Sequence, residues 1–262
     1  MAKLVSAVII TKNEEKMLTF CLNGIKWVDE IIIVDCGSTD KTVKIAKKYG
    51  AKVYYKKWPG YAAQKNYAIS KATGKWVLNI DADEVITEGL KYEIMTVLKN
   101  GTDKNAFDMP LNNIFYGRWL RHGGLSPDRN VRFFRKHCGK YPPCDIHEKL
   151  QIHGETGHFR NPLIRHAEEK ISTHLASINE YTDLEVKHRL RCGCMPTGYT
   201  VFIRPVYRFI KYYFFKLGFL DGIQGLTFHL LTALDLFVQE VKILEKTGLK
   251  VNLLKTLFKR SK

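Results

Sequence analysis

A chain of 262 residues is long enough to bury a full hydrophobic core, either as one large domain or as a domain with an appended segment. Its hydrophobic content of 45% and aromatic content of 12% exclude a disordered chain. The formal net charge of +16 suggests an anionic partner, namely a nucleic acid, a membrane surface or a phosphate-bearing substrate, although a lysine-rich soluble surface would give the same value.

The N-terminal part begins with a strand pattern followed by a helix pattern. Residues 3–10 form a nearly continuous apolar run without the small-residue cleavage site of a signal peptide, so we expect a first strand and a cytoplasmic protein. Residues 11–25 carry an apolar stripe at helical spacing. Thr11 and Glu14 are spaced for a capping box, which predicts that the helix starts there.

The alternation of strand and helix then continues to about residue 81. Strands are predicted at 30–35, 51–57 and 75–81, and helices at 38–50 and 62–74. Apolar strands separated by helices predict an α/β fold, a mostly parallel sheet with helices on both faces. Ligands of such sheets bind at the carboxyl ends of the strands, where Asp35 and Asp81 are expected to project into one crevice.

The strict alternation stops after Lys99. Residues 107–120, 130–136 and 148–154 read as strands of a smaller mixed or antiparallel region. From about Gly198 the chain is aromatic, basic and helical in pattern, and its last part could lie in a membrane interface, pack as a helical hairpin, or form a dimer contact. We therefore expect three regions: an α/β half at residues 1–100, a smaller mixed region at 101–197 and a basic aromatic helical segment at 198–262.

An acidic motif follows the last predicted parallel strand. Asp81 and Asp83 have the D-x-D spacing that can direct two carboxylates at one hard cation, Mg²⁺ or Mn²⁺, with phosphate oxygens and water completing its shell. Such a cation neutralises charge on a departing diphosphate. Glu84 or Glu88 could simply cap the next helix. Neither a P-loop nor a dinucleotide-binding glycine motif is present to hold phosphates in another way.

Residues 7–15, 31–42 and 58–84, taken together, resemble the nucleotide-sugar-binding half of the family 2 glycosyltransferases, which have the GT-A fold. Residues 123–136 and 145–150 resemble the subgroup that contains lipopolysaccharide-core β-1,4-glucosyltransferases. The resemblance implies an inverting transfer from a nucleoside diphosphate sugar, usually with Mg²⁺ or Mn²⁺. It also implies a small mixed-sheet acceptor region after the parallel half.

The resemblance assigns roles to individual residues. Asp35 is expected to read the base, and Asp81 and Asp83 to hold the ribose, the metal ion and the diphosphate. The residues that it places at the nucleotide sugar are Thr11, Asn13, Glu14, Asp35, Ser38, Lys65, Asn66 and Asp81, and it adds His147 as a tentative third metal ligand. Helix capping by Asn13 and Ser38, and a solvated side chain for Lys65, are the simpler alternatives.

Inversion requires one carboxylate to take the proton from the acceptor hydroxyl as it attacks. Glu148 is the predicted base, because it follows the metal motif and matches the family's His-Glu pair, and Asp145 and Asp128 are the alternatives. An ion pair with an arginine would explain Glu148 without catalysis, and an ordinary hydrogen bond would explain His147.

The expected acceptor carries phosphate. Five arginines in the segment expected to face it suit bidentate phosphate recognition, although solvated strand faces would explain them too: Arg118, Arg121, Arg129, Arg132 and Arg135. We therefore expect transfer of a hexose, with UDP-glucose as the expected donor, to a lipopolysaccharide inner core or a related phosphorylated glycolipid or core oligosaccharide, at the inner face of the cytoplasmic membrane.

Other functions remain open at this level. The acceptor could instead be a polyprenyl-linked sugar or a protein, and fold analogy leaves a nucleotidyltransferase. A non-catalytic basic protein bound to an anionic membrane surface belongs to a different class, and no nucleic-acid-binding module is present. The three aspartates Asp35, Asp81 and Asp83 favour the enzyme, because a protein that binds polyanions gains nothing from carboxylates in its crevice.

Overall fold

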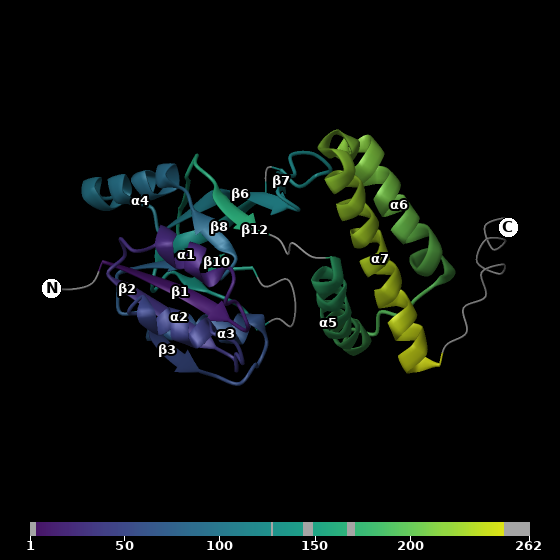
Figure 1. Cartoon of the computed structure of the whole chain (residues 1–262), viewed down its shortest axis with the longest axis horizontal. Helices are drawn as coiled ribbons and strands as arrows, with labels where there is room; N and C mark the ends of the chain where they lie inside the picture. The colour runs from purple at the N-terminus through teal and green to yellow at the C-terminus, as the bar shows by residue number, and fades with distance from the viewer. Residues whose placement is uncertain (1–3, 127, 144–148, 167–170, 249–262) are drawn as a thin grey trace. The chain divides into compact units, whose positions relative to one another are not determined.

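The computed structural model describes residues 4–126, 128–143, 149–166 and 171–248 (Figure 1). The chain forms two compact units, which are described separately below. The sheet unit consists of Met1–Asn113 and Pro127–His166, and the helical unit consists of Ile114–Ser126 and Ala167–Lys262. Residues 114–126 of the helical unit are thus inserted in the sequence between the two parts of the sheet unit.

The sheet unit alternates strands and helices in its first hundred residues and then continues mainly with strands. Its elements are β1 (Val5–Thr11), α1 (Leu18–Gly24), β2 (Glu30–Asp35), α2 (Thr42–Lys48), β3 (Lys52–Tyr55), α3 (Tyr61–Lys71), β4 (Trp76–Asn79), β5 (Glu84–Ile86), α4 (Glu88–Asn100), β6 (Ala106–Phe115, whose last two residues belong to the helical unit), β8 (Asp128–Arg135), β9 (Gly139–Lys140), β10 (Gln151–Ile152), β11 (Thr156–His158) and β12 (Leu163–His166).

The main sheet has the order β3-β2-β1-β4-β8-β6-β12-β5. The strands β3, β2, β1 and β4 run parallel, and β8 then pairs with β4 in the antiparallel sense. In this register Thr11 of β1 lies beside Asp35 of β2, and Val8 lies beside Asn79 of β4. The predicted α/β class, with a parallel half followed by a mixed region, is confirmed.

Helices cover both faces of this sheet because successive strand side chains point to opposite sides. Ala7 and Ile9 of β1 belong to a core shared with Leu22 of α1 and with α2 and α4. Val8 belongs instead to a second core, which it shares with Ala68 of α3. The continuous apolar runs that predicted buried parallel strands therefore supply two cores.

The predicted start of the first helix is wrong. Thr11 is the last residue of β1, and α1 begins only at Leu18, without a side-chain cap. Asn13 has a positive φ of 58°, which takes the chain out of the helical conformation, and its backbone N–H donates to the Ser38 hydroxyl at 2.8 Å. The contacts with the loop after β2 therefore replace the expected capping box.

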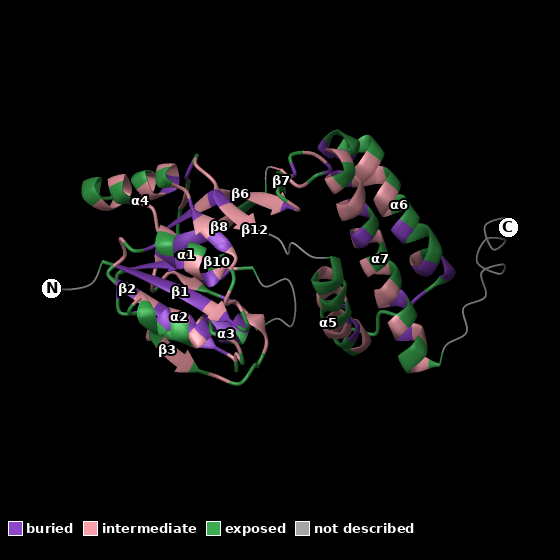
Figure 2. Cartoon of the chain, viewed as in Figure 1, coloured by how far each residue is buried: buried purple, intermediate pink, exposed green. Residues whose placement is uncertain are grey.

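The helical unit starts with the last two residues of β6. β7 (Arg118–Trp119) is a short strand that pairs with them. Its helices are α5 (Ile171–Arg191), η1 (Tyr199–Ile203), α6 (Arg204–Ile210), η2 (Lys211–Phe215), η3 (Gly218–Asp221) and α7 (Gly222–Thr247). Phe115 and Leu120 pack against Leu231 of α7, so the segment of residues 114–126 contributes to the core of this unit. Figure 2 shows exposed residues over much of α6.

Within the described residues, no single helix has both the length and the apolar composition needed to cross a bilayer. The segments Tyr199–Phe215 and Gly218–Thr247, which meet at a bend of 75°, satisfy that test only as a pair.

Candidate active site

The site is built at the carboxyl ends of the parallel strands. Asp35 is the last residue of β2, and Asp81 follows two residues after the end of β4. β1 lies between these two strands, so the ends of β2 and β4 are two strand spacings apart, about 10 Å. Carboxylates that are 46 positions apart in the sequence therefore lie along one edge of the sheet, as predicted.

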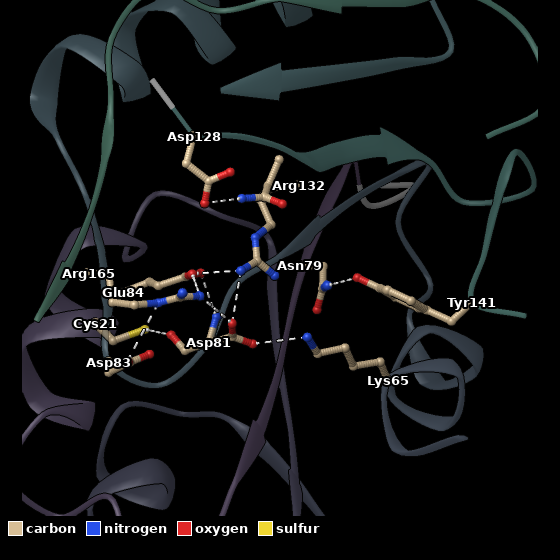
Figure 3. Close-up of polar contacts among 11 residues, drawn as sticks. Cys21, Lys65, Asn79, Asp81, Asp83, Glu84, Asp128, Arg132, Tyr141 and Arg165 are labelled. Atoms are coloured by element: carbon tan, nitrogen blue, oxygen red, sulfur yellow. Dashed lines mark hydrogen bonds and ion pairs between the residues drawn. The ribbon is translucent and has the colours of Figure 1, made fainter. Parts of the chain in front are cut away.

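The acidic motif after β4 forms a cluster with three basic side chains (Figure 3). We call it the charge cluster, and its members are Asp81, Asp83, Glu84, Lys65, Arg132 and Arg165. Glu84 begins β5 and is fully buried, and its Oε2 accepts the backbone N–H of Asp81 at 2.9 Å. Of the two residues considered as caps of the next helix, Glu84 does not cap it, since Thr87 is the N-cap of α4, and Glu88 lies in its first turn.

Two arginines hold this turn from neighbouring strands. Arg132 Nη2 lies 2.9 Å from Asp81 Oδ2 and 2.6 Å from Glu84 Oε1. Arg165 Nη2 makes the same pair of contacts at 3.0 and 2.5 Å. Lys65 Nζ, from α3, approaches the other oxygen of Asp81 at 3.4 Å. The three positive charges of these side chains match the three carboxylates of the charge cluster.

The carboxylates of the charge cluster are not equally compensated. Burial opposes ionisation of Asp81, but the charges of Arg132, Lys65 and Arg165 outweigh it and hold the pKa of Asp81 well below its usual range. Burial raises the pKa of Asp83 to about 7; the Arg165 charge opposes the shift, and the charges of Glu84 and Asp81 add to it. Asp83 has its nearest basic atom, Arg165 Nε, at 3.8 Å.

The donor set of the charge cluster fits a hard divalent cation. Carboxylate oxygens are the protein ligands that Mg²⁺ and Mn²⁺ prefer, and Asp83 is the carboxylate least engaged by basic groups. Across the described ranges, no three His, Cys, Asp or Glu side chains are grouped to hold a metal ion. A cation bound by Asp83 and Asp81 would therefore require further oxygen ligands from substrate or water. His147 lies outside the described residues.

Asp35 shapes the loop that follows it. Its Oδ2 accepts the backbone N–H groups of Gly37 and Ser38 at 2.8 and 2.9 Å. Its Oδ1 accepts the hydroxyls of Ser38 and Thr11. Both oxygens of this buried carboxylate are therefore engaged within the loop, and the base-reading role of Asp35 stays a prediction.

The loops after β1 and β2 are tied to each other by reciprocal hydrogen bonds. The Asn13 side-chain oxygen accepts the Thr39 N–H at 2.8 Å, and the backbone N–H of Glu14 donates to the Thr42 hydroxyl at 2.7 Å. Thr11, Asn13, Glu14 and Ser38, all predicted to bind nucleotide, thus lie together in one pair of loops. Their nucleotide contacts stay predictions.

The structure separates the two α3 residues that were predicted to bind nucleotide. Lys65 is buried and belongs to the charge cluster. Asn66 instead holds Tyr141, because its amide nitrogen donates to the Tyr141 carbonyl at 2.7 Å and its oxygen accepts the Tyr141 N–H at 3.0 Å. Asn79 of β4 in turn donates to the Tyr141 hydroxyl at 2.5 Å. Asn66 therefore holds the backbone of Tyr141 against α3, and its contact with nucleotide stays a prediction.

The predicted base Glu148 and the alternative Asp145 lie outside the described residues. Asp128, the other alternative, begins β8 with an exposed side chain. Its Oδ2 accepts from the Asn130 amide at 3.3 Å (Figure 3). The geometry of Asp128 leaves its carboxylate accessible to solvent, and the choice among these three carboxylates stays a prediction.

The five arginines predicted to face the acceptor belong to two different units and have different partners. Arg132 is buried in the charge cluster. Arg129 donates from Nε to the carboxylate of Asp108 on the neighbouring strand at 2.8 Å, and Arg135 donates to two backbone carbonyls. The other two, Arg118 and Arg121, belong to the helical unit. Recognition of an acceptor phosphate by these arginines stays a prediction.

Two members of the charge cluster were missed in the sequence. Glu84 was considered only as a helix cap, and Arg165 was not singled out. Arg165 lies 81 positions after Glu84 and reaches it because β12 pairs with β5 in the antiparallel sense, with Arg165 opposite Glu84. The only sequence signal was a single arginine in the short apolar stretch of residues 163–166.

Comparison with known proteins gives the family. The family model described as Glycosyl transferase family 2 matches residues 6–160, more than half of the chain. The lipopolysaccharide core biosynthesis glycosyltransferase LpsC of Rhizobium meliloti is 27% identical over 94% of this chain and 93% of its own length. An uncharacterized glycosyltransferase of Rickettsia typhi is 28% identical over 93% of this chain and 87% of its own.

Among solved structures, that of S. aureus TarS residues 1–349 is similar with a TM-score of 0.48 and 14% identity, over 95% of this chain and 93% of that one. The parallel sheet with a D-x-D turn after β4 and the matched family model agree on a GT-A fold. The chain therefore belongs to glycosyl transferase family 2 and is a glycosyltransferase.

Proposed function

We propose that this enzyme transfers a hexose from a nucleoside diphosphate sugar to a phosphorylated glycolipid or core oligosaccharide of the bacterial envelope, with inversion at the anomeric carbon. UDP-glucose is the expected donor, and a lipopolysaccharide inner core is the expected acceptor. The similarity to LpsC, whose name gives it a role in lipopolysaccharide core biosynthesis, supports this acceptor class. The charge cluster supports the donor class.

The observation that carries the proposal is the balance of charge around Asp81. Lys65, Arg132 and Arg165 all lie within 3.4 Å of the Asp81 carboxylate, and Glu84 and Asp83 supply the further carboxyl groups beside them. A nucleoside diphosphate that arrives with a divalent cation adds little net charge, so this balance is kept when the donor binds. A Mg²⁺ or Mn²⁺ ion held by Asp83 and Asp81 would neutralise the negative charge that develops on the departing diphosphate.

The basic side chains of the charge cluster differ in how far they are exposed to an incoming diphosphate. Arg132 has an exposed fraction of only 8%, so its function is to orient Asp81 and Glu84. Arg165 retains an exposed fraction of 31% and is the arginine that a diphosphate can reach. Lys65 contacts Asp81 at 3.4 Å and has an exposed fraction of only 7%, so in the bare charge cluster it too orients Asp81, and its predicted contact with the diphosphate would require Asp81 to release it.

The transfer itself is a single displacement. Glu148 takes the proton from the acceptor hydroxyl while the hydroxyl oxygen bonds to the anomeric carbon. The bond between this carbon and the diphosphate oxygen breaks, and its electron pair leaves with the diphosphate. Because donor and acceptor of this kind meet at the membrane, we place the enzyme in the cytoplasm, peripheral to the inner face of the cytoplasmic membrane.

Calorimetric titration tests the donor side of this proposal. UDP, GDP, CDP and TDP are titrated with and without Mn²⁺ into the wild type, into Asp83→Asn and into the control Asp103→Asn. Asp103 is a suitable control because its side chain has an exposed fraction of 83% and lies outside the charge cluster. We expect UDP alone to bind, to require Mn²⁺, and to be lost only in Asp83→Asn. Metal-independent binding, or equal binding by both variants, would contradict the assigned metal site.

Mass spectrometry of the reaction products tests the acceptor. The wild type is incubated with UDP-glucose and with a lipopolysaccharide inner-core acceptor, a polyprenyl-linked sugar or a peptide. A mass increase of one hexose on the core acceptor alone is expected. An increase on either of the other two would keep the chemistry and replace the acceptor.

A further inference from the structure

The last helix of the helical unit exposes a continuous apolar stripe. Ile223 and Leu230 of α7 have exposed fractions of 67% and 50%. The stripe of α7 consists of Ile223, Leu230, Leu234, Phe237 and Val241. Separations of seven, four, three and four residues place all of them on one face of an α-helix. At about 1.5 Å per residue, this face runs for most of the helix length.

The buried residues of α7 include two polar side chains. His229 and Glu240 have exposed fractions of only 3% and 1%. Glu240 is bound by Arg189 of α5 through two hydrogen bonds of 2.6 and 3.2 Å. A helix at the surface of a water-soluble protein normally buries its apolar face and exposes its polar one. α7 buries Leu231 and Ile243 in this way, but it also buries an ion pair and exposes isoleucine, leucine and phenylalanine.

The preceding helical segment also exposes apolar side chains. Its exposed apolar residues recur at helical spacing and are Tyr199, Phe202, Ile203, Val206, Tyr207, Ile210 and Phe214. Basic residues lie between them at Arg204, Arg208 and Lys211, and Lys211 Nζ lies 5.7 Å from the centre of the Tyr207 ring. Aromatic side chains interleaved with lysine and arginine are typical of the interface between lipid tails and headgroups.

The sheet unit has no comparable surface among its described residues. Its exposed large apolar side chains are Leu4, Phe20, Tyr55, Trp58, Tyr92 and Met95. They are distributed over separate strands, helices and loops, and single exposed apolar residues are normal on soluble proteins. The concentration of exposed apolar residues is therefore a property of the helical unit.

We propose that the stripe of α7 and the exposed apolar residues of Tyr199–Phe214 bind the interface of an anionic lipid bilayer. Charge favours this partner over a second copy of the chain: residues 204–262 contain eleven Lys or Arg and four Asp or Glu, so two copies would repel each other while anionic headgroups would attract. The 75° bend between the two segments suits shallow insertion rather than a straight span.

This inference deepens the proposed function. It rests on that function only for the reason why the enzyme would bind a membrane. A glycolipid acceptor presents its sugar at the headgroup level, so a bound helical unit would keep the enzyme where its acceptor is concentrated. The surface itself is derived from the helical unit alone. Its test is therefore separate from the test of sugar transfer.

Vesicle co-sedimentation of the full chain tests the surface. Vesicles of phosphatidylcholine are compared with vesicles that contain about one-third phosphatidylglycerol. The stripe variant is Ile223→Ser/Leu230→Ser/Phe237→Ser. The control carries Phe20→Ser/Tyr92→Ser/Met95→Ser, which replaces equally exposed side chains of the sheet unit. A second variant, Lys211→Gln/Lys216→Gln, removes charge without touching the stripe, so it keeps the test informative if the stripe variant does not fold.

We expect the wild type and the control to bind anionic vesicles, and the stripe variant to lose about tenfold or more in affinity. Lys211→Gln/Lys216→Gln should reduce the preference for anionic over zwitterionic vesicles. Unchanged vesicle binding by both variants would overturn the proposal. A wild-type dimer in sedimentation velocity that the stripe variant abolishes, without vesicle binding, would assign the surface to a second copy and also overturn it.

Nucleotide titration of the same preparations separates the two proposals. Vesicle binding without any nucleotide binding would support the membrane surface and contradict the proposed function. Nucleotide binding without vesicle binding would leave the proposed sugar transfer intact and overturn the membrane surface together with the proposed place of the enzyme at the membrane.

Discussion

Asn66 of α3 and Tyr141 are joined by two hydrogen bonds that use both ends of the Asn66 amide and both backbone groups of Tyr141, at 2.7 and 3.0 Å. The pair connects the helix that carries Lys65 to the start of the segment that leads to the predicted base, Glu148. Its side chain holds the backbone of Tyr141 against α3. We therefore predict that Asn66 is a positioning residue.

Replacing Asn66 should impair turnover more than donor binding. Asn66→Ala removes both hydrogen bonds to Tyr141, at a cost of about 1–3 kcal/mol in folding free energy. We expect kcat to fall about tenfold while the KM for the donor changes less, because neither of the two lost hydrogen bonds is made by a member of the charge cluster. Steady-state kinetics and thermal denaturation measure the two effects. Ser70→Ala, in the same helix, is the control, and an equal loss there would contradict the positioning role.

Removing the charge of Glu84 should destabilise the sheet unit. Glu84→Gln leaves Arg132 and Arg165 with one carboxylate fewer in a buried environment, which we expect to cost about 3 kcal/mol. Urea denaturation measures this change. Glu88→Gln is the matched control, because the Glu88 side chain is 86% exposed and makes a surface ion pair with Lys91, so its effect should stay within about 0.5 kcal/mol. Equal midpoints for the two variants would refute the structural role of Glu84.

The base assignment makes a kinetic prediction. Glu148→Gln should lower kcat by about a factor of 1,000 or more, with the affinity for UDP and Mn²⁺ unchanged, because only proton removal from the acceptor is lost. Asp145→Asn and Asp128→Asn are measured beside it by radiolabelled sugar transfer. Near wild-type transfer by Glu148→Gln, with a large loss in one of the other two, would move the base to that residue.

Acid should weaken the contact between the loops after β1 and β2 through Asp40. Its carboxylate accepts the Thr42 N–H at 2.9 Å, the Thr42 hydroxyl, and the Glu15 N–H at 3.1 Å. Burial opposes ionisation of Asp40, but these hydrogen bonds outweigh it and lower its pKa from the ordinary 3.8. A lowered pKa in the folded state adds stability that is complete above pH 3.8 and is lost as the pH falls through the folded pKa.

We therefore expect Asp40→Asn to be less stable than the wild type by about 1 kcal/mol near neutral pH. The difference should shrink below pH 3.8, where the wild-type carboxyl is protonated as well. Thermal denaturation of both proteins across the pH range measures it. A difference that does not vary with pH would show that the carboxylate charge contributes nothing.

The sequence was sufficient for the features that depend on local periodicity. Apolar runs separated by helical stripes predicted the parallel strands β1 to β4, since strands buried on both faces have no polar alternation. The place of Asp35 and Asp81 at one edge of the sheet followed from parallel pairing. The start of α1 was wrong, because the positive φ of Asn13 and its contacts with Ser38 and Thr39 depend on a loop about 25 residues away.

What only the tertiary structure decided is which charges meet. Asp81 and Glu84 could be seen in the sequence as acidic residues, but their partners Arg132 and Arg165 come from strands β8 and β12, about 50 and 80 positions later. Ion pairing depends on distance in space, and strand register sets that distance without leaving a periodic signal in the sequence. The polar side chains that α7 buries, His229 and Glu240, are another such case, because composition alone does not tell which side of a helix its neighbours cover.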